Sequence, residues 1–137
     1  MLDPRLRKDT YQLGRLDGSC LLLMRNALFP WFVLVPDTNE VEFHKLSWKM
    51  QKKVLKQVNH VSHFIEENYK IDKINIGAIG NVVSQMHVHI VGRSKGDICW
   101  PGVVWGVNDF KQYEAGQLES IKMKISHYFK DSIQLRN

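Results

Sequence analysis

Two histidines separated by a single valine, His87 and His89, stand in a short apolar segment that has the pattern of a β-strand. Side chains alternate across a strand, so Gln85, His87 and His89 are expected on one face, about 6.5–7 Å apart along the strand, with apolar residues on the other. An amide and two imidazoles in a row suit two kinds of chemistry. They fit half of a metal site, or a catalytic imidazole with supporting hydrogen-bond donors.

A metal site needs further ligands, and the nearest donors in the sequence are His60, His63 and Glu66. Their spacing of three residues gives them a common face on the long helix predicted for this part of the chain. That face lies opposite the apolar stripe of the same helix, which favours surface residues over metal ligands.

Nucleophilic catalysis is the other interpretation of the histidine strand. A ring nitrogen of His87 would attack a phosphorus atom and form a covalent phospho-histidine, which water then cleaves. Such a step needs a neutral, oriented ring and donors for the phosphate oxygens. Gln85 and His89 on the same face, and Asn81, Ser84 and the backbone amides of the preceding glycine loop, could supply them. A solvated polar sheet face is the alternative that spacing alone leaves open.

The elements that must position these residues follow from periodicity and turn residues. Ser47 is a predicted N-cap, and apolar residues then recur at steps of three and four along the following helix. The predicted elements are strands at 11–16 and 20–24 around the turn Asp17-Gly18, a strand at 31–35, a helix from Ser47 to about Tyr69, strands at 71–76 and 85–93, and a helix over 113–129. We therefore expect one α+β domain over residues 1–137, with an antiparallel sheet of about five strands, one long central helix and a C-terminal helix.

Charge and composition limit the partners. The formal net charge is +5, which suits phosphate-bearing ligands but falls short of a nucleic-acid footprint, so no nucleic-acid partner is expected. Five lysines fall on or just before the long helix, and a solvated helix face is the favoured interpretation of that run: Lys45, Lys49, Lys52, Lys53 and Lys56.

The expected compartment is the cytoplasm. No stretch reaches the roughly 18–20 apolar residues of a membrane helix, and the first residues lack the apolar segment of a signal peptide. Cys20 and Cys99 lie far apart without a CxxC pattern, so we expect two reduced thiols and no structural zinc site.

The segment His87–Arg93 resembles the motif of the histidine triad (HIT) family of nucleotide hydrolases and transferases, His-φ-His-φ-His-φ-φ with φ apolar. Gly80-Asn81 before it and Trp100–Gly102 after it also match. The strand Phe29–Pro36 and the helix entry Phe43–Ser47 are similar to the same family, so the resemblance covers most of the chain.

The resemblance implies a role for each matching residue. His87, at the middle histidine, would be the nucleophile, and His89, at the third, would contact the transferred phosphate. Gln85 stands where the first histidine ordinarily helps to orient the nucleophile, and an amide cannot titrate. Asn81 matches an amide that binds phosphate oxygens, and Asn75 a residue near the catalytic loop.

Three further positions complete the comparison with the motif. Val82 falls where many members place a serine or threonine that assists the leaving group, and Trp31 where a further histidine often stands. Asn26 is a candidate ribose contact, and Trp31 a candidate wall of a base-binding cleft, with a place in the core as the alternative.

The expected function is hydrolysis or transfer of a nucleotidyl group from a phosphoramidate or a dinucleoside polyphosphate, through a covalent intermediate on His87. The implied partners are a purine nucleotide or dinucleotide and a second copy of the chain, whose sheet would continue the first. No metal or other cofactor is required at the nucleophile. The alternative is a nucleotide-binding module with weakened catalysis, for which Gln85, Val82 and Trp31 are the reasons.

Overall fold

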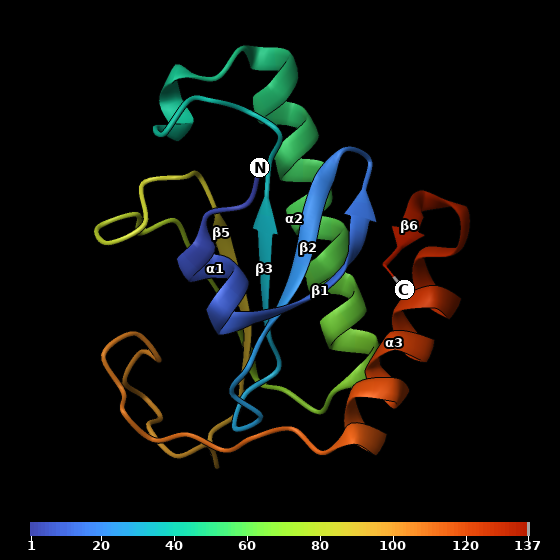
Figure 1. The fold of residues 1–137 in the computed structure, drawn as a ribbon. Helices are drawn as coiled ribbons and strands as arrows, with labels where there is room; N and C mark the ends of the chain where they lie inside the picture. Colours follow the sequence, from blue (N-terminus) through green and yellow to red (C-terminus); the bar gives the residue numbers. More distant parts are fainter. Residues whose placement is uncertain (137) are drawn as a thin grey trace.

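The computed structural model describes residues 1–136, which form one sheet and three α-helices (Figure 1). The elements in chain order are α1 (Pro4–Asp9), β1 (Thr10–Leu16), β2 (Ser19–Met24), β3 (Trp31–Val35), a 3-10 turn (Phe43–Lys45), α2 (Trp48–Asn68), β4 (Lys73–Gly77), β5 (Val88–Arg93), α3 (Ala115–Phe129), a second 3-10 turn (Lys130–Ser132) and β6 (Ile133–Leu135).

The sheet confirms the predicted α+β class, with six strands in place of about five. Its order is β4-β5-β3-β2-β1-β6, and every neighbouring pair is antiparallel. The added strand, β6, has only three residues and so carries no alternation that a sequence could show. It fits against β1 because Gly14 has no side chain where the backbone of Gln134 comes close.

The β1–β2 hairpin forms at the predicted turn. Asp17 and Gly18 both have positive φ, 47° and 86°, which is the conformation that a two-residue hairpin turn requires. Glycine adopts it without a steric cost and aspartate tolerates it better than most residues.

Helix α2 begins and ends where the sequence predicts. The Ser47 hydroxyl accepts a hydrogen bond from the backbone N–H of Met50 at 3.2 Å, and the backbone becomes extended at Tyr69. The apolar stripe of α2 lies against the sheet, with the Phe64 ring edge-on to Phe32. Gly92 allows this approach, because a Cβ there would lie 2.9 Å from the Ile65 side chain.

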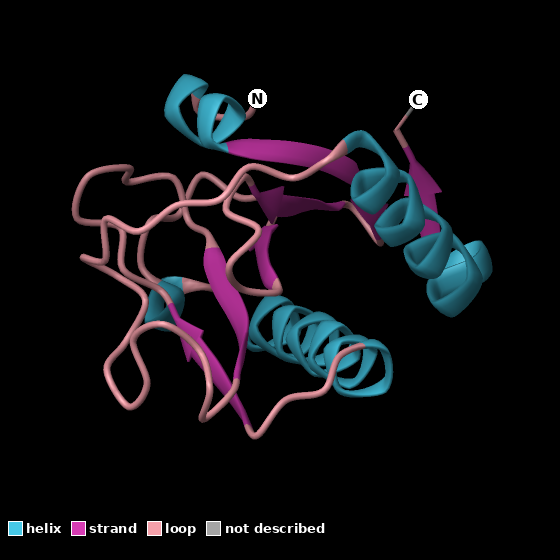
Figure 2. Cartoon of the chain, turned by 90° about the horizontal axis from the view of Figure 1, so that it is seen from below, coloured by secondary structure: helices cyan, strands magenta, loops and turns pink. Residues whose placement is uncertain are grey.

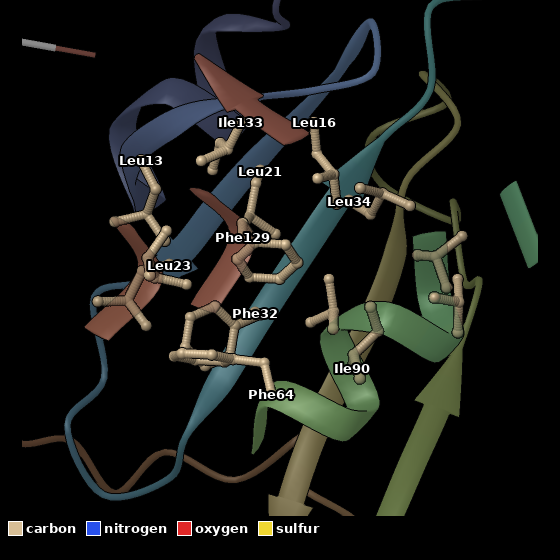
Figure 3. Packing of buried hydrophobic residues seen from close by; sticks show 14 of the residues in the cluster. Leu13, Leu16, Leu21, Leu23, Phe32, Leu34, Phe64, Ile90, Phe129 and Ile133 are labelled. Atoms are coloured by element: carbon tan, nitrogen blue, oxygen red, sulfur yellow. The ribbon is translucent and has the colours of Figure 1, made fainter. Parts of the chain in front are cut away.

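The two faces of the sheet differ in their cover. Helices α2 and α3 lie on one side, and helix α1 and long loops lie on the other (Figure 2). The helix side holds the larger apolar core, in which Leu21, Phe32 and Ile90 of the sheet meet Phe64 and Phe129 of the helices (Figure 3). His89 and Trp31 alternate with the core residues of their strands, so they emerge on the opposite face beneath the loops.

Among residues 1–136, no helix combines the length and the apolar character that a membrane crossing demands.

Candidate functional site

The ring of His87 is fixed by its own backbone. Its Nδ1 lies 2.6 Å from the carbonyl oxygen of Gln85, and a carbonyl oxygen can only accept a hydrogen bond. Nδ1 therefore carries the hydrogen, and in the neutral ring Nε2 keeps a free lone pair. This is the arrangement that a nucleophilic imidazole needs.

His89 is held by Trp31. The indole Nε1–H of Trp31 donates to Nδ1 of His89 at 2.9 Å, so the neutral ring of His89 carries its hydrogen on Nε2. Burial, with a smaller contribution from the charge of His87, lowers the pKa of His89 from 6.5 to about 4. His89 is thus a neutral hydrogen-bond donor over the physiological pH range.

The two imidazoles lie together under an aromatic cover. Their ring centroids are 5.1 Å apart, and Trp105 from the loop after β5 lies 5.6 Å from His89. Each histidine is only 6% exposed. The indole N–H of Trp105 is buried and has no hydrogen-bond partner among the described residues, so the site contains a donor that a bound oxygen could satisfy.

Gln85 precedes strand β5, which is shorter than the predicted strand over 85–93. Strand β5 begins at Val88, and the residues from Gln85 to His87 approach it in irregular conformation. The side-chain oxygen of Gln85 accepts from the backbone N–H of Asp3 at 2.7 Å, and its amide nitrogen donates to the carbonyl of Met1 at 2.9 Å. The glutamine side chain therefore ties the N-terminus to the histidine segment.

A second contact holds the same N-terminal residues in place. The Arg5 guanidinium donates to the carbonyl oxygen of Val82 at 2.9 Å and pairs with the Asp3 carboxylate. The hydrogen bonds from Arg5, and to a lesser degree the nearby His87, hold the pKa of Asp3 below its usual value. Residues 1–5 thus border the loop that carries His87.

Asn75 contributes to a buried polar cluster at the far end of β5. Its side-chain oxygen accepts from Arg93 at 2.9 Å, and Arg93 also makes a two-pronged pair with the Asp97 carboxylate at 2.8 and 3.0 Å. Arg93 is almost completely buried, and its hydrogen bonds lower the pKa of Asp97. Sequence spacing alone gave no indication of this cluster.

The remaining substrate-binding candidates are separated. Asn26 joins the β2–β3 connection to the loop before α3, since its side chain bonds the backbone of Leu28, Asp109 and Lys111. Asn81 and Ser84 are exposed in the loop between β4 and β5, close in sequence to His87. Contacts of these side chains with a nucleotide stay predictions.

The donors weighed as metal ligands lie elsewhere on α2. His60 is half-buried against Phe129, while His63 and Glu66 are exposed and face each other at 3.6 Å. In the described part of the chain, no group of three or more His, Cys, Asp or Glu side chains comes together as a metal site would.

Comparison with known proteins gives the family. The HIT domain profile matches residues 5–96. The chain belongs to the histidine triad (HIT) family. The resemblance found in the sequence is thereby confirmed.

Solved HIT structures match nearly the whole chain. A histidine triad protein from Bradyrhizobium japonicum is 36% identical, with 93% of this chain and 96% of that one covered and a TM-score of 0.89. One from Marinobacter aquaeolei VT8 is 35% identical, with 93% and 94% covered and a TM-score of 0.88. A hypothetical histidine triad nucleotide-binding protein from Sulfolobus tokodaii shares the fold at 19% identity and a TM-score of 0.66, over 91% and 87% of the chains. No match was found among curated proteins.

Proposed function

We propose that this HIT protein hydrolyses or transfers a nucleotidyl group, taken from a nucleoside phosphoramidate or a dinucleoside polyphosphate, through a covalent intermediate on His87. Membership of the family supports a nucleotide-directed function. The observation that carries the specific proposal is the contact between Nδ1 of His87 and the carbonyl of Gln85, because it leaves Nε2 free to attack.

In the proposed first step, the lone pair of His87 Nε2 attacks the α-phosphorus of the nucleotide. A nitrogen–phosphorus bond forms while the bond to the leaving amine or phosphate breaks, and the leaving group departs with that electron pair and takes a proton from water. The ring keeps its hydrogen on Nδ1 and becomes cationic, and the Gln85 carbonyl stabilises that charge at 2.6 Å.

In the second step, water attacks the same phosphorus and releases a nucleoside monophosphate. The new oxygen–phosphorus bond replaces the bond to Nε2, and a proton passes to solvent. His89 donates from Nε2 to a phosphate oxygen in both steps, since Trp31 occupies its Nδ1. The unpartnered N–H of Trp105 is a second candidate donor near His89.

The test is release of nucleoside monophosphate from adenosine phosphoramidate and from a diadenosine polyphosphate. His87→Ala is expected to abolish turnover with folding intact, while the matched change at exposed His63 leaves it unaltered. A trapped nucleotidyl adduct on His87 in the active protein would identify the intermediate. Equal turnover by His87→Ala would refute the mechanism.

A binding module without turnover is the second candidate. The observation in its favour is that both imidazoles are more than nine-tenths buried, so a nucleotide must displace part of the cover to reach Nε2. Saturable binding of a nucleoside monophosphate with no product from either substrate would favour the module over the enzyme.

We also propose that the chain forms a homodimer. Strand β4 is an edge of the sheet, and Ile76 on it is 55% exposed, so this edge has both unpaired backbone groups and apolar surface to cover. Sedimentation equilibrium of the protein and of Ile76→Lys tests the pairing, with a shift to monomer expected in the variant.

A further inference from the structure

A basic cleft opens between the first half of α2, the β1–β2 turn and the segment around β6. Its volume is about 970 Å³, which is within the size range of sites for small molecules. Five cationic side chains line it: Arg15, Lys49, Lys52, Lys53 and Lys56. Four of the five lysines that the sequence suggested as a solvated helix face thus border one hollow.

The charge in the cleft is only partly balanced. Asp17 and Asp131 are the two carboxylates among its lining residues, which leaves a formal excess of three positive charges with His60 neutral. Lys53 approaches Asp17 at 3.8 Å. Within the described chain, no carboxylate lies within 4 Å of the ammonium groups of Lys49, Lys52 or Lys56. These three cations are available to a ligand.

The floor of the cleft is polar and hydrogen-bonded. Gln57 is buried there, and its amide accepts from the Ser19 hydroxyl at 2.8 Å and donates to the carbonyl of Leu16 at 2.8 Å. These bonds fix the β1–β2 turn to α2. Lys49, Lys53 and Lys56 are spaced about one helical turn apart on the same side of α2, so their charges gather over this hydrogen-bonded floor.

The cleft is separate from the histidine site. Helix α2 covers the sheet face opposite His89, and β1 and β6 lie at the edge opposite β4. A dimer joined through β4 would leave the cleft open.

We propose that this cleft binds a small phosphate-rich anion with three or more negative charges, either a short inorganic polyphosphate or the triphosphate group of a nucleotide. Lysine ammonium groups are compact charges on flexible stems and suit phosphate oxygens without fixed geometry. The net attraction grows with the charge of the ligand, so the excess of three positive charges favours an anion with three or more negative charges over one of low charge.

The experiment is calorimetric titration with tripolyphosphate, and separately with ATP, on the full chain. The double variant Lys49→Ala/Lys56→Ala is expected to weaken tripolyphosphate binding by roughly tenfold, since each exposed ion pair contributes modestly. Lys70→Ala/Lys95→Ala is the matched control, because it removes two exposed charges outside the cleft. Both doubles should keep the melting temperature of the parent chain.

The position of the ligand is checked by amide chemical shifts. Tripolyphosphate is expected to move the Gly18 amide in the turn that lines the cleft, with smaller changes around His87. Equal affinities for ATP and tripolyphosphate would indicate that the phosphate groups alone are recognised. Tighter binding of ATP that is still weakened in Lys49→Ala/Lys56→Ala would indicate that the ligand is a nucleotide. The proposal would be overturned if tripolyphosphate does not bind, or if the two double variants weaken its binding equally. Chemical-shift changes centred on His87 would also overturn it.

Discussion

The indole N–H of Trp31 donates to Nδ1 of His89 at 2.9 Å, across 58 positions of sequence. The indole donor of Trp31 selects the tautomer of the neighbouring imidazole, so the neutral ring of His89 carries its hydrogen on Nε2. Trp31 therefore has a defined structural role at the histidine site.

Replacing Trp31 by phenylalanine removes that donor while keeping an aromatic ring. The Nδ1 of His89 loses its partner and the ring is free to change tautomer, so we expect the proposed turnover to fall roughly tenfold, as loss of one buried hydrogen bond implies. Steady-state kinetics with adenosine phosphoramidate measures this change in turnover. Trp48→Phe at an exposed position is the control, and unchanged kcat in Trp31→Phe would contradict the role.

The pH dependence of stability should report the burial of His89. Its pKa is about 4 in the folded chain against 6.5 as the reference value, so between these values the unfolded chain binds more protons and folding weakens as pH falls. The unfolding free energy should fall by about 3 kcal/mol when the pH drops from above 6.5 to below 4. Urea unfolding at pH 7 and pH 4.5 measures it. The unfolding free energy of His89→Gln should fall less over this pH range than that of the parent chain. An equal fall in both proteins would show that the pH dependence does not come from His89.

Gln85→Ala should release the N-terminus from the histidine segment. Two backbone groups, the N–H of Asp3 and the carbonyl of Met1, lose their partner, and we expect a cost of about 1–2 kcal/mol in unfolding free energy. Hydrogen exchange at the Asp3 amide should accelerate, while Gln134→Ala, an exposed change, leaves it as it was. An unaltered exchange rate at Asp3 in Gln85→Ala would disprove the anchoring role.

Asp97→Ala should be the most destabilising of these changes. It leaves the buried Arg93 without its carboxylate, which typically costs about 3–5 kcal/mol. The double variant Arg93→Met/Asp97→Ala should recover part of that loss, because no uncompensated charge is then buried. Urea unfolding compares both with Asp37→Ala on the surface, and a loss at Asp97 no larger than at Asp37 would contradict the assignment.

Local patterns account for the parts of the fold that sequence predicted well. The Asp17-Gly18 turn set the first hairpin and Ser47 capped α2. The apolar run Trp31–Val35, bounded by Pro30 and Pro36, matched β3 to the residue. Each depends on contacts between residues close in the chain. Helix α1 and strand β6 were missed because six and three residues are too few to show a period.

The candidate site also has a part that the sequence predicted and a part that it did not. The spacing of His87 and His89, together with the flanking motif, was enough to identify the family. That His87 is the nucleophile stays a prediction. The direction of the Gln85 side chain was not predictable, since its partners lie more than 80 positions away and β5 begins three residues later than expected.

The sequence by itself determined the order of the main elements, the family and the pair of imidazoles, because those depend on local periodicity and on residue identity. Only the tertiary structure decided that Trp31 holds His89, that Gln85 holds the N-terminus and that lysines of α2 border a cleft. Those relationships arise where distant segments meet, and the packing of the sheet against its helices and loops sets which side chains come within hydrogen-bonding distance.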